Sequence, residues 1–239
     1  MNMSRPFAVL MMLLAAGASL LLAGAAQAPQ QKEDGFTPLF NGKDFTGWVY
    51  GLRANGTENK SGKGYQIENG VIYSTKEDGG NLYTEKEYAN FVFRFEFRLT
   101  PNANNGIGIR APLVGDAAYA GMEIQVLDDG GSEYTNLLPG QYHGSIYKVA
   151  PAKRGFQKPV GEWNSEEIVA NGRQITVKLN GTTIVDANLD DVKDEATLKE
   201  HRDLSKPDGS QGIANTKGHI GFLGHGAHVE FRNIRVKVL

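Results

Sequence analysis

Two carboxylates and an amide lie close together in the run Glu123-Ile124-Gln125-Val126-Leu127-Asp128. Successive side chains of a β-strand point to opposite faces, so Glu123 and Gln125 would project from one face roughly 6.6 Å apart. Asp128 has the opposite parity and returns to that face only if a bulge inserts one residue. Two carboxylates on one face are typical of general acid–base chemistry on a sugar, and a solvated outer face is the alternative interpretation.

Polar side chains on other predicted strands favour the acid–base interpretation. If these strands share a sheet, their polar faces form a charged concave cleft. Glycines at 106 and 108 would let a ligand approach the backbone. The polar side chains in question are Arg94, Glu96, Arg98 and Arg110, together with His143, Ser145 and Tyr147 in a later run.

These side chains depend on short strands to position them. In the run 91–99, Phe93, Phe95 and Phe97 alternate with charged residues, as in a strand with one buried face. Asn180-Gly181 lies between two alternating runs and predicts a hairpin. Only residues 190–202 have a helical pattern. Many strands and almost no helix predict an all-β fold, an antiparallel β-sandwich or jelly roll. Further strands are expected at 106–110, 122–126, 175–179, 182–185, 219–223 and 229–232, with a terminal strand near Val236 and Val238.

Composition excludes several classes of protein. The 239 residues carry a formal net charge of −2, which argues against a nucleic-acid binder and against a polybasic membrane-surface protein. There is no cysteine, which excludes thiol catalysis, thiolate metal sites and disulfides. The phosphate loop, the zinc helix and the nucleophile elbow are all missing from the sequence. Gly224-His225-Gly226 indicates a turn more than a metal site, and Trp48 and Trp163 are expected to pack rather than to stack on sugars.

The N-terminus has the pattern of a secretory signal peptide. Arg5 precedes an apolar run over 7–26, and small residues follow at 23–28. A transmembrane anchor is the alternative, because the run approaches the roughly 20 residues that a bilayer needs. We therefore predict a signal peptide at 1–28 with cleavage within 23–28, a linker at 29–35 and one β-sandwich domain at 36–239. The expected location is periplasmic or secreted, without stable membrane insertion after cleavage.

Seven short motifs, in order, resemble those of the 3-keto-disaccharide hydrolase family, and they cover about residues 36–239. No single motif is specific to the family, but the occurrence of all seven in this order is. The motifs are Leu39-Phe40-Asn41-Gly42-Lys43-Asp44-Phe45-Thr46-Gly47-Trp48, Asn105-Gly106-Ile107-Gly108-Ile109-Arg110, the run 123–128, Gly144-Ser145-Ile146-Tyr147, Gly161-Glu162-Trp163-Asn164, Asn180-Gly181, and the C-terminal Gly218-His219-Ile220-Gly221-Phe222 with His225-Gly226 and Phe231-Arg232-Asn233-Ile234.

The resemblance implies a concanavalin A-like lectin/glucanase sandwich and an exported hydrolase of glycosides oxidised at sugar carbon 3. The ketone acidifies the hydrogen on carbon 2, so a base can start an elimination that water addition completes. We expect Glu123 to be the base, Arg110 to stabilise the enolate, and Asp128 or His143 to donate a proton. Substrate-binding candidates are Gln125, Tyr147, Glu96, Asn105 and His225.

No cofactor is expected, although a divalent metal could replace Arg110 as the electrophile. The expected partner is a carbohydrate, and the oligomeric state is left open. Two other functions fit the same sandwich. A carbohydrate-binding module would bind sugar without cleaving it. A conventional glucanase would need two carboxylates about 5–5.5 Å apart for retention. Gln125 and Asp128 stand where glucanases of this fold have acids, which argues against the usual retaining pair.

Overall fold

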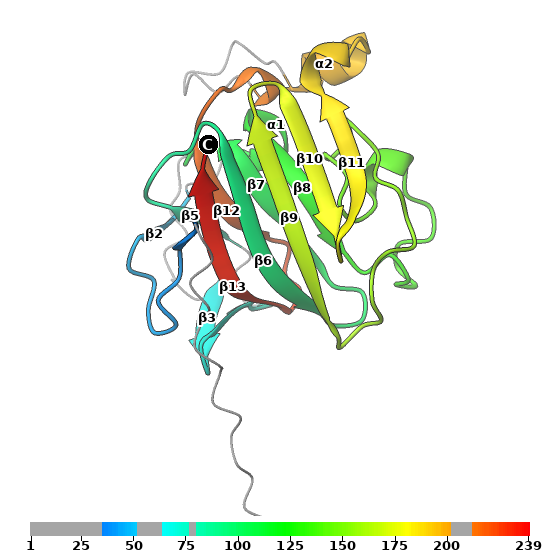
Figure 1. Ribbon diagram of the computed structural model, residues 1–239. Coiled ribbons are helices and arrows are strands. Elements are labelled where there is room, and N and C mark those ends of the chain that lie inside the picture. Colours follow the sequence, from blue (N-terminus) through cyan, green and yellow to red (C-terminus); the bar gives the residue numbers. More distant parts are fainter. Residues whose placement is uncertain (1–34, 52–63, 77–79, 202–211) are drawn as a thin grey trace, which may run out of the picture.

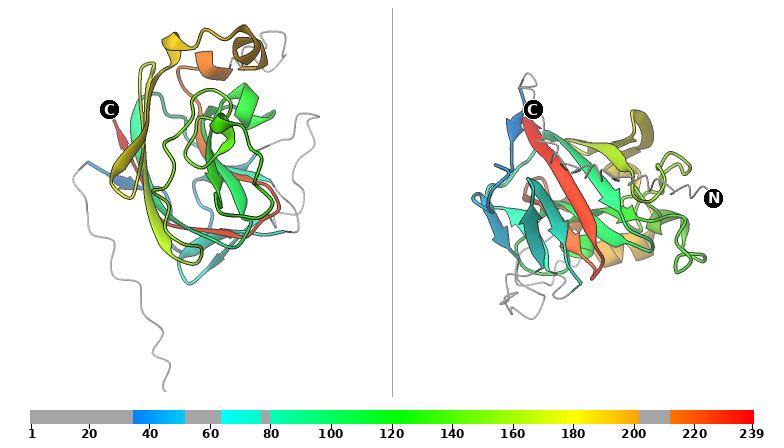
Figure 2. Two further views of the ribbon diagram at one scale, coloured as in Figure 1. Left: turned by 90° about the vertical axis from the view of Figure 1, so that its right-hand side faces the viewer. Right: turned by 90° about the horizontal axis from the view of Figure 1, so that it is seen from below.

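The computed structural model describes residues 35–51, 64–76, 80–201 and 212–239. Within these ranges, two antiparallel β-sheets pack face to face (Figure 1), and the edge-on view separates the two layers (Figure 2). This arrangement confirms the predicted all-β antiparallel sandwich. The predicted signal peptide at 1–28 lies outside the described residues. None of the described helices is both long enough and apolar enough to cross a membrane.

The larger sheet has eight strands within the described ranges, and the smaller sheet has five. The spatial order of the larger sheet is β11 (Thr182–Asn188), β10 (Gln174–Leu179), β9 (Trp163–Asn171), β6 (Phe91–Leu99), β13 (Val229–Val238), β4 (Val71–Ser74) and β3 (Tyr65–Glu68), with β1 (Thr37–Pro38) paired to β13. The order of the smaller sheet is β2 (Trp48–Tyr50), β5 (Asn81–Thr84), β12 (His219–Gly224), β7 (Asn104–Ala111) and β8 (Met122–Leu127).

Alternation along the strands places the core between the two sheets. In β6, every second residue from Phe91 to Leu99 is buried, and the charged residues between them lie on the outer face. Phe222 of β12 stacks on Phe231 of β13 with ring centroids 4.2 Å apart, so aromatic rings join the two layers. The burial of these large apolar side chains is the main term that stabilises the fold.

The predicted hairpin at Asn180-Gly181 joins β10 to β11. Both residues have positive φ, 50° for Asn180 and 86° for Gly181, which a two-residue turn between twisted strands requires. The strand predicted over 91–99 is confirmed as β6. The helix predicted over 190–202 is confirmed in part, because the structure has η2 (Leu189–Asp191) and then α2 (Glu195–His201), while residue 202 lies outside the described ranges.

Short helices and one long loop surround the smaller sheet. The loop that follows β8 returns beside it, because the backbone N–H of Tyr147 donates to the Glu123 carbonyl at 2.8 Å and that of Gln125 to the Ser145 carbonyl at 3.0 Å. Figure 1 shows α1 and α2 at the same end of the molecule, with α1 over the end of the smaller sheet. The remaining helices are α1 (Ala117–Ala120), η1 (Pro139–Gln141) and η3 (Gly212–Ala214).

Candidate active site

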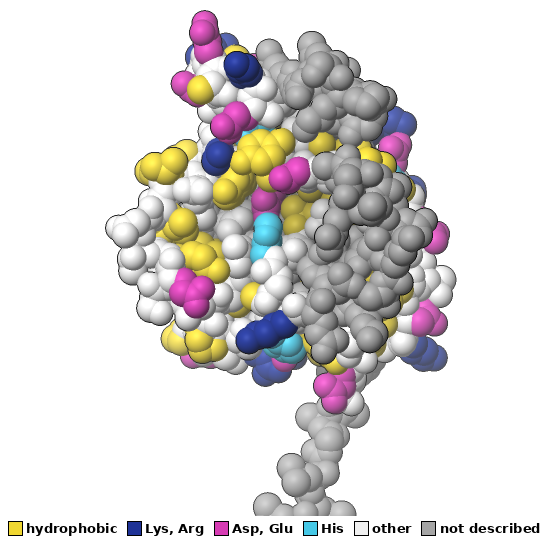
Figure 3. All heavy atoms as spheres, turned by 180° about the vertical axis from the view of Figure 1, so that it is seen from behind, with side chains coloured by type: hydrophobic (Ala, Val, Ile, Leu, Met, Phe, Trp, Pro, Cys, Tyr) yellow, Lys and Arg dark blue, Asp and Glu magenta, His cyan; other side chains and the backbone are white. Residues whose placement is uncertain are grey.

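A pocket of about 260 Å³ lies on the face of the smaller sheet that points away from the larger sheet. Viewed from behind Figure 1, a histidine side chain lies next to an acidic one near the middle of this face (Figure 3). Most of the lining side chains are polar, as a site for a hydroxylated ligand requires. The lining residues are Asn104, Asp116, Ala118, Tyr119, Glu123, Gln125, Leu127, Tyr134, Leu137, Gln141, Tyr147 and His225.

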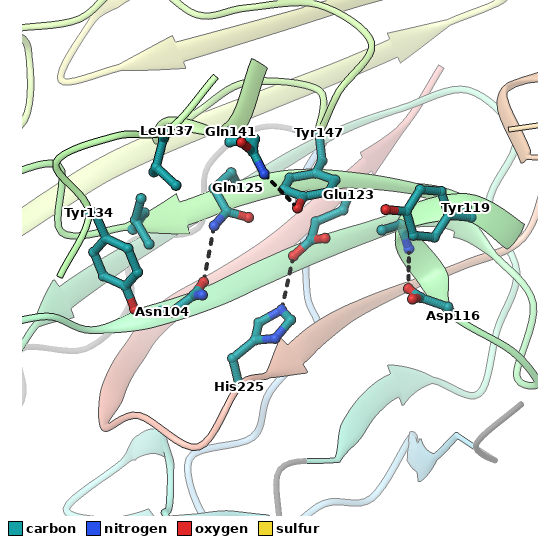
Figure 4. Close-up of a pocket in the computed structure, with 12 residues that line it drawn as sticks. Asn104, Asp116, Tyr119, Glu123, Gln125, Tyr134, Leu137, Gln141, Tyr147 and His225 are labelled. Atoms are coloured by element: carbon teal, nitrogen blue, oxygen red, sulfur yellow. Dashed lines mark hydrogen bonds and ion pairs between the residues drawn. The ribbon is translucent and has the colours of Figure 1, made fainter. Parts of the chain in front are cut away.

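The structure brings together four of the residues singled out in the sequence: Glu123, Gln125, Tyr147 and His225 (Figure 4). Glu123 and Gln125 both project from β8 into the pocket, as the alternation of a strand dictates. Tyr147 comes from the loop that returns beside β8. His225 follows directly after β12, which is separated from β8 by β7.

Glu123 and His225 form the charged centre of the pocket. The Nε2 atom of His225 lies 3.3 Å from Oε1 of Glu123. Burial disfavours the charged imidazolium, but the hydrogen bond and the charge of Glu123 outweigh that cost and raise the pKa of His225. The side chain of His225 is 45% exposed and that of Glu123 only 4%, so the imidazole faces an incoming ligand and the carboxylate lies deeper.

Gly106 of β7 creates the space that the Glu123 carboxylate occupies. A Cβ atom at position 106 would lie 2.0 Å from Oε1 of Glu123, well inside any allowed contact. The two residues belong to paired strands, since Gly106 lies opposite Gln125 and Gly108 opposite Glu123. The glycine at this position was expected to let a ligand approach the backbone. The group that approaches it is the protein's own carboxylate.

Two amide side chains hold the neighbouring walls of the pocket. Nε2 of Gln125 donates to Oδ1 of Asn104 at 3.0 Å, and Nε2 of Gln141 donates to the hydroxyl of Tyr147 at 3.0 Å. Gln141 is itself fixed, because its Oε1 accepts the backbone N–H of Leu138 at 3.0 Å. These bonds orient polar groups toward a shared space before any ligand arrives, which lowers the entropic cost of binding.

Arg110 lies outside the pocket, which corrects its predicted role beside Glu123. Its side chain is buried, with Nε donating to the Ala89 carbonyl at 2.9 Å and Nη1 to the Gly172 carbonyl at 2.8 Å. The backbone of Arg110 has a positive φ of 47° at a register shift in β7, so strand alternation fails where the prediction depended on it. Arg110 joins loops of the protein to one another.

Asp128 also lies outside the pocket, because it binds the turn between β6 and β7 and the start of the loop after β8. Its Oδ2 accepts the backbone N–H of Asn102 at 2.9 Å, and its Oδ1 accepts that of Gly130 at 3.2 Å. The bulge that would have returned Asp128 to the face of Glu123 does not form, since the pairing of β7 with β8 has no register shift. The predicted pair of carboxylates on one strand therefore does not meet in the pocket.

His143 is buried between the sheets, with its ring against Phe97 at a centroid distance of 5.0 Å. Its Nδ1 accepts the backbone N–H of Leu127 at 3.3 Å, and its Nε2 lies 3.3 Å from Oε2 of the buried Glu166. A ring whose Nδ1 accepts a hydrogen bond carries its proton on Nε2, which faces Glu166. His143 therefore stabilises the loop and does not reach the pocket, contrary to the predicted role of proton donor.

The polar face of β6 belongs to the larger sheet, so the predicted single cleft divides between two surfaces. Glu96 pairs there with Arg232 at 2.7 Å and does not line the pocket. Asn105 was expected to bind substrate, but its side chain points into the core, where its Nδ2 donates to the buried hydroxyl of Tyr65 at 3.2 Å. Its neighbour Asn104 lines the pocket instead, a shift of one residue that reverses the face.

Both tryptophans pack, as predicted. The Trp48 ring stacks on Phe222 with centroids 5.4 Å apart, and its Nε1 donates to the Leu39 carbonyl at 2.7 Å. The Trp163 ring lies under the guanidinium groups of Arg98 and Arg232. Neither ring lines the pocket. The aromatic side chains that do line it are tyrosines, namely Tyr119, Tyr134 and Tyr147.

Sequence reasoning missed several residues of the pocket, and they come from loops. Asp116 caps α1 by accepting the Ala118 N–H at 3.0 Å, and this cap presents Tyr119 to the pocket. An aspartate before a short Ala-rich run is a helix-start signal that could have identified α1. Gln141 and Tyr134 lie in the loop after β8, whose path no periodic pattern predicts.

The described residues contain no group of three or more His, Cys, Asp or Glu side chains arranged to hold a metal ion. Glu123 and His225 are two adjacent side chains of the kinds that bind divalent metals. The two side chains contact each other at 3.3 Å, slightly longer than a typical N–H···O hydrogen bond.

Comparison with known proteins gives a consistent set of relatives. Residues 35–237 match the family described as the 3-keto-alpha-glucoside-1,2-lyase-like domain. A 3-keto-disaccharide hydrolase from Bacteroides thetaiotaomicron is 28% identical over 235 residues, which cover 86% of this chain and 79% of the relative.

Solved structures from Parabacteroides distasonis share the fold. One protein proposed to be a glycosyl hydrolase superposes with a TM-score of 0.65 at 28% identity, covering 86% of this chain and 94% of its own. A second has a TM-score of 0.65 at 25% identity, covering 85% of this chain and 99% of its own. The two-sheet arrangement described above is therefore the arrangement of these relatives.

Proposed function

The chain belongs to the family of 3-keto-α-glucoside-1,2-lyase-like domains, and we propose that it hydrolyses the glycosidic bond of a 3-keto-glycoside over β8. This membership confirms the family resemblance that the sequence motifs indicated. The observation that carries the proposal is the contact of 3.3 Å between Glu123 and His225 in a polar pocket. A carboxylate and an imidazolium in contact supply a base and an acid for one reaction.

Because the substrate carries a ketone, one base and one acid are sufficient to cleave its glycosidic bond. A carbonyl at carbon 3 acidifies the hydrogen on carbon 2, and the glycosidic oxygen on carbon 1 is β to the resulting carbanion. Removal of the proton gives an enolate, which expels the oxygen of the leaving group and leaves a double bond between carbons 1 and 2. Water then adds, with its oxygen bonding to carbon 1 and a proton to carbon 2. The net change is hydrolysis without oxidation or reduction.

Glu123 and His225 take complementary roles in this sequence. Glu123 removes the proton from carbon 2, exchanges it with water after the leaving group departs, and then donates a proton to carbon 2. His225 gives its proton to the departing oxygen and regains one from the attacking water. The charge of the imidazolium also stabilises the enolate, the role predicted for Arg110 before its position was known. Gln125 and Tyr147 bind sugar hydroxyls from the same face.

The names of the relatives agree with an elimination. The family is that of lyase-like domains, and the relative from Bacteroides thetaiotaomicron is a 3-keto-disaccharide hydrolase. Elimination alone would be a lyase reaction, and elimination followed by water addition is a net hydrolysis. If water adds in this way, a reaction in deuterium oxide should place deuterium at carbon 2 of the product. Product without that label would contradict the mechanism.

The deciding experiment compares a 3-keto-disaccharide with its unoxidised parent, using purified protein with and without a chelator. Release of 3-ketoglucose only from the oxidised sugar supports the proposal, and loss of activity with the chelator would support the divalent-metal hypothesis. Glu123→Gln should lower kcat about 10²–10⁴-fold, the usual effect of losing a general base, in a protein that is still folded and unfolds cooperatively. The matched control is Glu162→Gln, at an exposed position outside the pocket. Sugar binding without cleavage would favour a carbohydrate-binding module.

Export is part of the same proposal. The apolar run over 7–26 and the small residues at 23–28 support secretion across a membrane. N-terminal sequencing of the protein recovered from the periplasm or the medium should begin within or directly after residues 23–28. A chain that keeps residue 1 and fractionates with membranes would instead support the anchor alternative.

A further inference from the structure

A second pocket of about 320 Å³ adjoins the candidate active site. It lies between α2 and the loop after β8, and Gln141 lines both pockets. Lys148 of the second pocket lies over the rings of Tyr119 and Tyr147, which line the first, at 5.4 and 5.9 Å from their centroids. The two pockets are therefore neighbours separated by the Gln141–Tyr147 hydrogen bond.

The size of the first pocket leaves part of a glycoside outside it. Sites for small molecules usually enclose roughly 300–1,000 Å³, and the first pocket is smaller, at about 260 Å³. A sugar ring with its carbon 2 against Glu123 would occupy this space. The group attached through the glycosidic oxygen must then lie in an adjoining space, and the second pocket is a neighbour that shares Gln141 with the first.

The second pocket has a different chemistry from the first. Its apolar lining comes from Leu138, Pro139, Val149, Pro151 and Ala196, and the Leu138 side chain is 64% exposed. An exposed leucine beside two prolines and a valine offers an apolar surface that a ligand can cover. Burial of apolar area is the term that would hold a ligand there.

The polar side chains of the second pocket already have partners. Lys148 contacts Glu200 at 3.5 Å, and Gln141 is bonded to Leu138 and Tyr147. The backbone N–H of Thr197 donates to Asp194 at 2.7 Å, and its hydroxyl also bonds to that carboxylate. An apolar ligand would leave these bonds intact, whereas a hydroxylated ligand would gain little from groups that are already paired.

We propose that the second pocket is a subsite for the leaving group and that it favours an aglycone with an apolar face, such as a phenyl ring. The inference rests on the proposed function, because it places the reacting sugar in the first pocket. It adds a substrate class, 3-keto-glycosides of aromatic or other partly apolar alcohols. Discrimination of this kind in an apolar pocket is usually about 10–200-fold.

The test uses methyl and 4-nitrophenyl 3-keto-glucosides of the anomer that the wild-type protein cleaves. Ala196 lies exposed on α2 and lines the second pocket only, so Ala196→Trp should fill it. We expect the ratio of kcat/KM for the nitrophenyl substrate to that for the methyl substrate to fall about tenfold relative to wild type. The matched control, Glu195→Trp, adds the same ring at an exposed position outside the pocket and should keep the ratio.

A second variant, Leu138→Ser, removes apolar surface instead of adding bulk and should lower the same ratio several-fold. Thermal unfolding of each variant checks that it is folded. An unchanged ratio in both pocket variants, or an equal loss for both substrates, would overturn the subsite. Failure of the wild-type protein to release 3-ketoglucose from a 3-keto-disaccharide as well as from both glucosides would instead overturn the proposed function, so the two failures are distinguishable.

Discussion

Glu123 and His225 differ in solvent exposure, and this difference indicates which of them acts as the base and which as the acid. The carboxylate is 4% exposed and lies over the backbone of β7, whereas the imidazole is 45% exposed. A ligand entering from solvent therefore meets the imidazole at the opening and the carboxylate at the floor. A base at the floor can reach a ring hydrogen, and an acid at the opening can reach the oxygen that leaves.

The ion pair predicts how His225 titrates. Because the hydrogen bond and the charge of Glu123 outweigh the effect of burial and raise the pKa of His225, Glu123→Gln should lower it. NMR titration of the histidine ring resonances measures the change directly and does not depend on activity. His228 is a matched control, since it lies three residues away and contacts Glu230 instead. Its resonances should be the same in both proteins.

The same shift predicts how stability depends on pH. The folded pKa of His225 lies above its unfolded value of about 6.5, so the stabilisation is fully present below that value. It is lost as pH rises through the folded pKa. The difference in unfolding free energy between wild type and Glu123→Gln should therefore shrink on the alkaline side. A difference that stays constant from pH 6 to the alkaline side would contradict the ion pair.

At the scale of the strand, the close packing of Glu123 on Gly106 predicts that a substitution at position 106 lowers activity much more than it lowers stability. In Gly106→Ala, the new Cβ would overlap the end of the Glu123 side chain, which lies 2.0 Å from that position. The flexible carboxylate should move and the backbone should stay. A displacement of about 1 Å costs roughly 10²-fold in rate, so kcat should fall by about that factor, while the loss of stability should be no larger than that of Glu123→Gln.

Gly108→Ala is the control on the same strand. There the nearest atoms to a new Cβ belong to Leu223 and Tyr83, at 3.2 and 3.3 Å, and Glu123 is not among them. We expect a small loss of stability and little change in kcat. Equal activity in the variants at 106 and 108 would show that the carboxylate does not need its observed position.

Strand periodicity explains which elements and site residues were predictable. Alternation predicted β6 and the shared face of Glu123 and Gln125, because side-chain direction along a regular strand is a local property. The substrate-binding role that the family resemblance implied for Asn105 is wrong, because the strand turns Asn104 to the pocket instead. Asp128 keeps the parity opposite to Glu123 and lies one residue beyond β8, where the bulge that it needed does not form. At the end of a strand, hydrogen bonds to loops decide where a side chain points.

At the scale of the whole molecule, the sequence could not predict which sheet each strand joins. The polar faces of β6 and β8 were expected in one cleft, but β6 belongs to the larger sheet and β8 to the smaller. Assignment to a sheet depends on pairing between distant segments, which a single strand's pattern does not encode. The family motifs supplied the order of the segments and the expected function, and the pocket itself required the three-dimensional arrangement.

The hydrogen bonds of Arg110 connect the two sheets, and they predict how much this connection contributes to stability. Its guanidinium donates to the carbonyls of Ala89 and Gly172, which flank β6 and β9 of the larger sheet, while its own backbone belongs to β7 of the smaller sheet. Lysine lacks the planar fork that reaches several acceptors at once. Since each hydrogen bond from a charged group contributes about 1.5–3 kcal/mol, Arg110→Lys should lower the free energy of unfolding by about 2–4 kcal/mol.

Chemical denaturation measures this loss, and the kinetics of the folded protein distinguish a structural from a catalytic arginine. If Arg110 only joins loops, kcat of folded Arg110→Lys should stay within about threefold of wild type, since the side chain lies outside the pocket. The control, Arg98→Lys, changes an arginine that is 40% exposed on the outer face of β6. It should cost less than about 1 kcal/mol. A hundredfold loss of kcat with unchanged stability in Arg110→Lys would return this residue to the chemistry, because only contact with the reacting sugar could produce that combination.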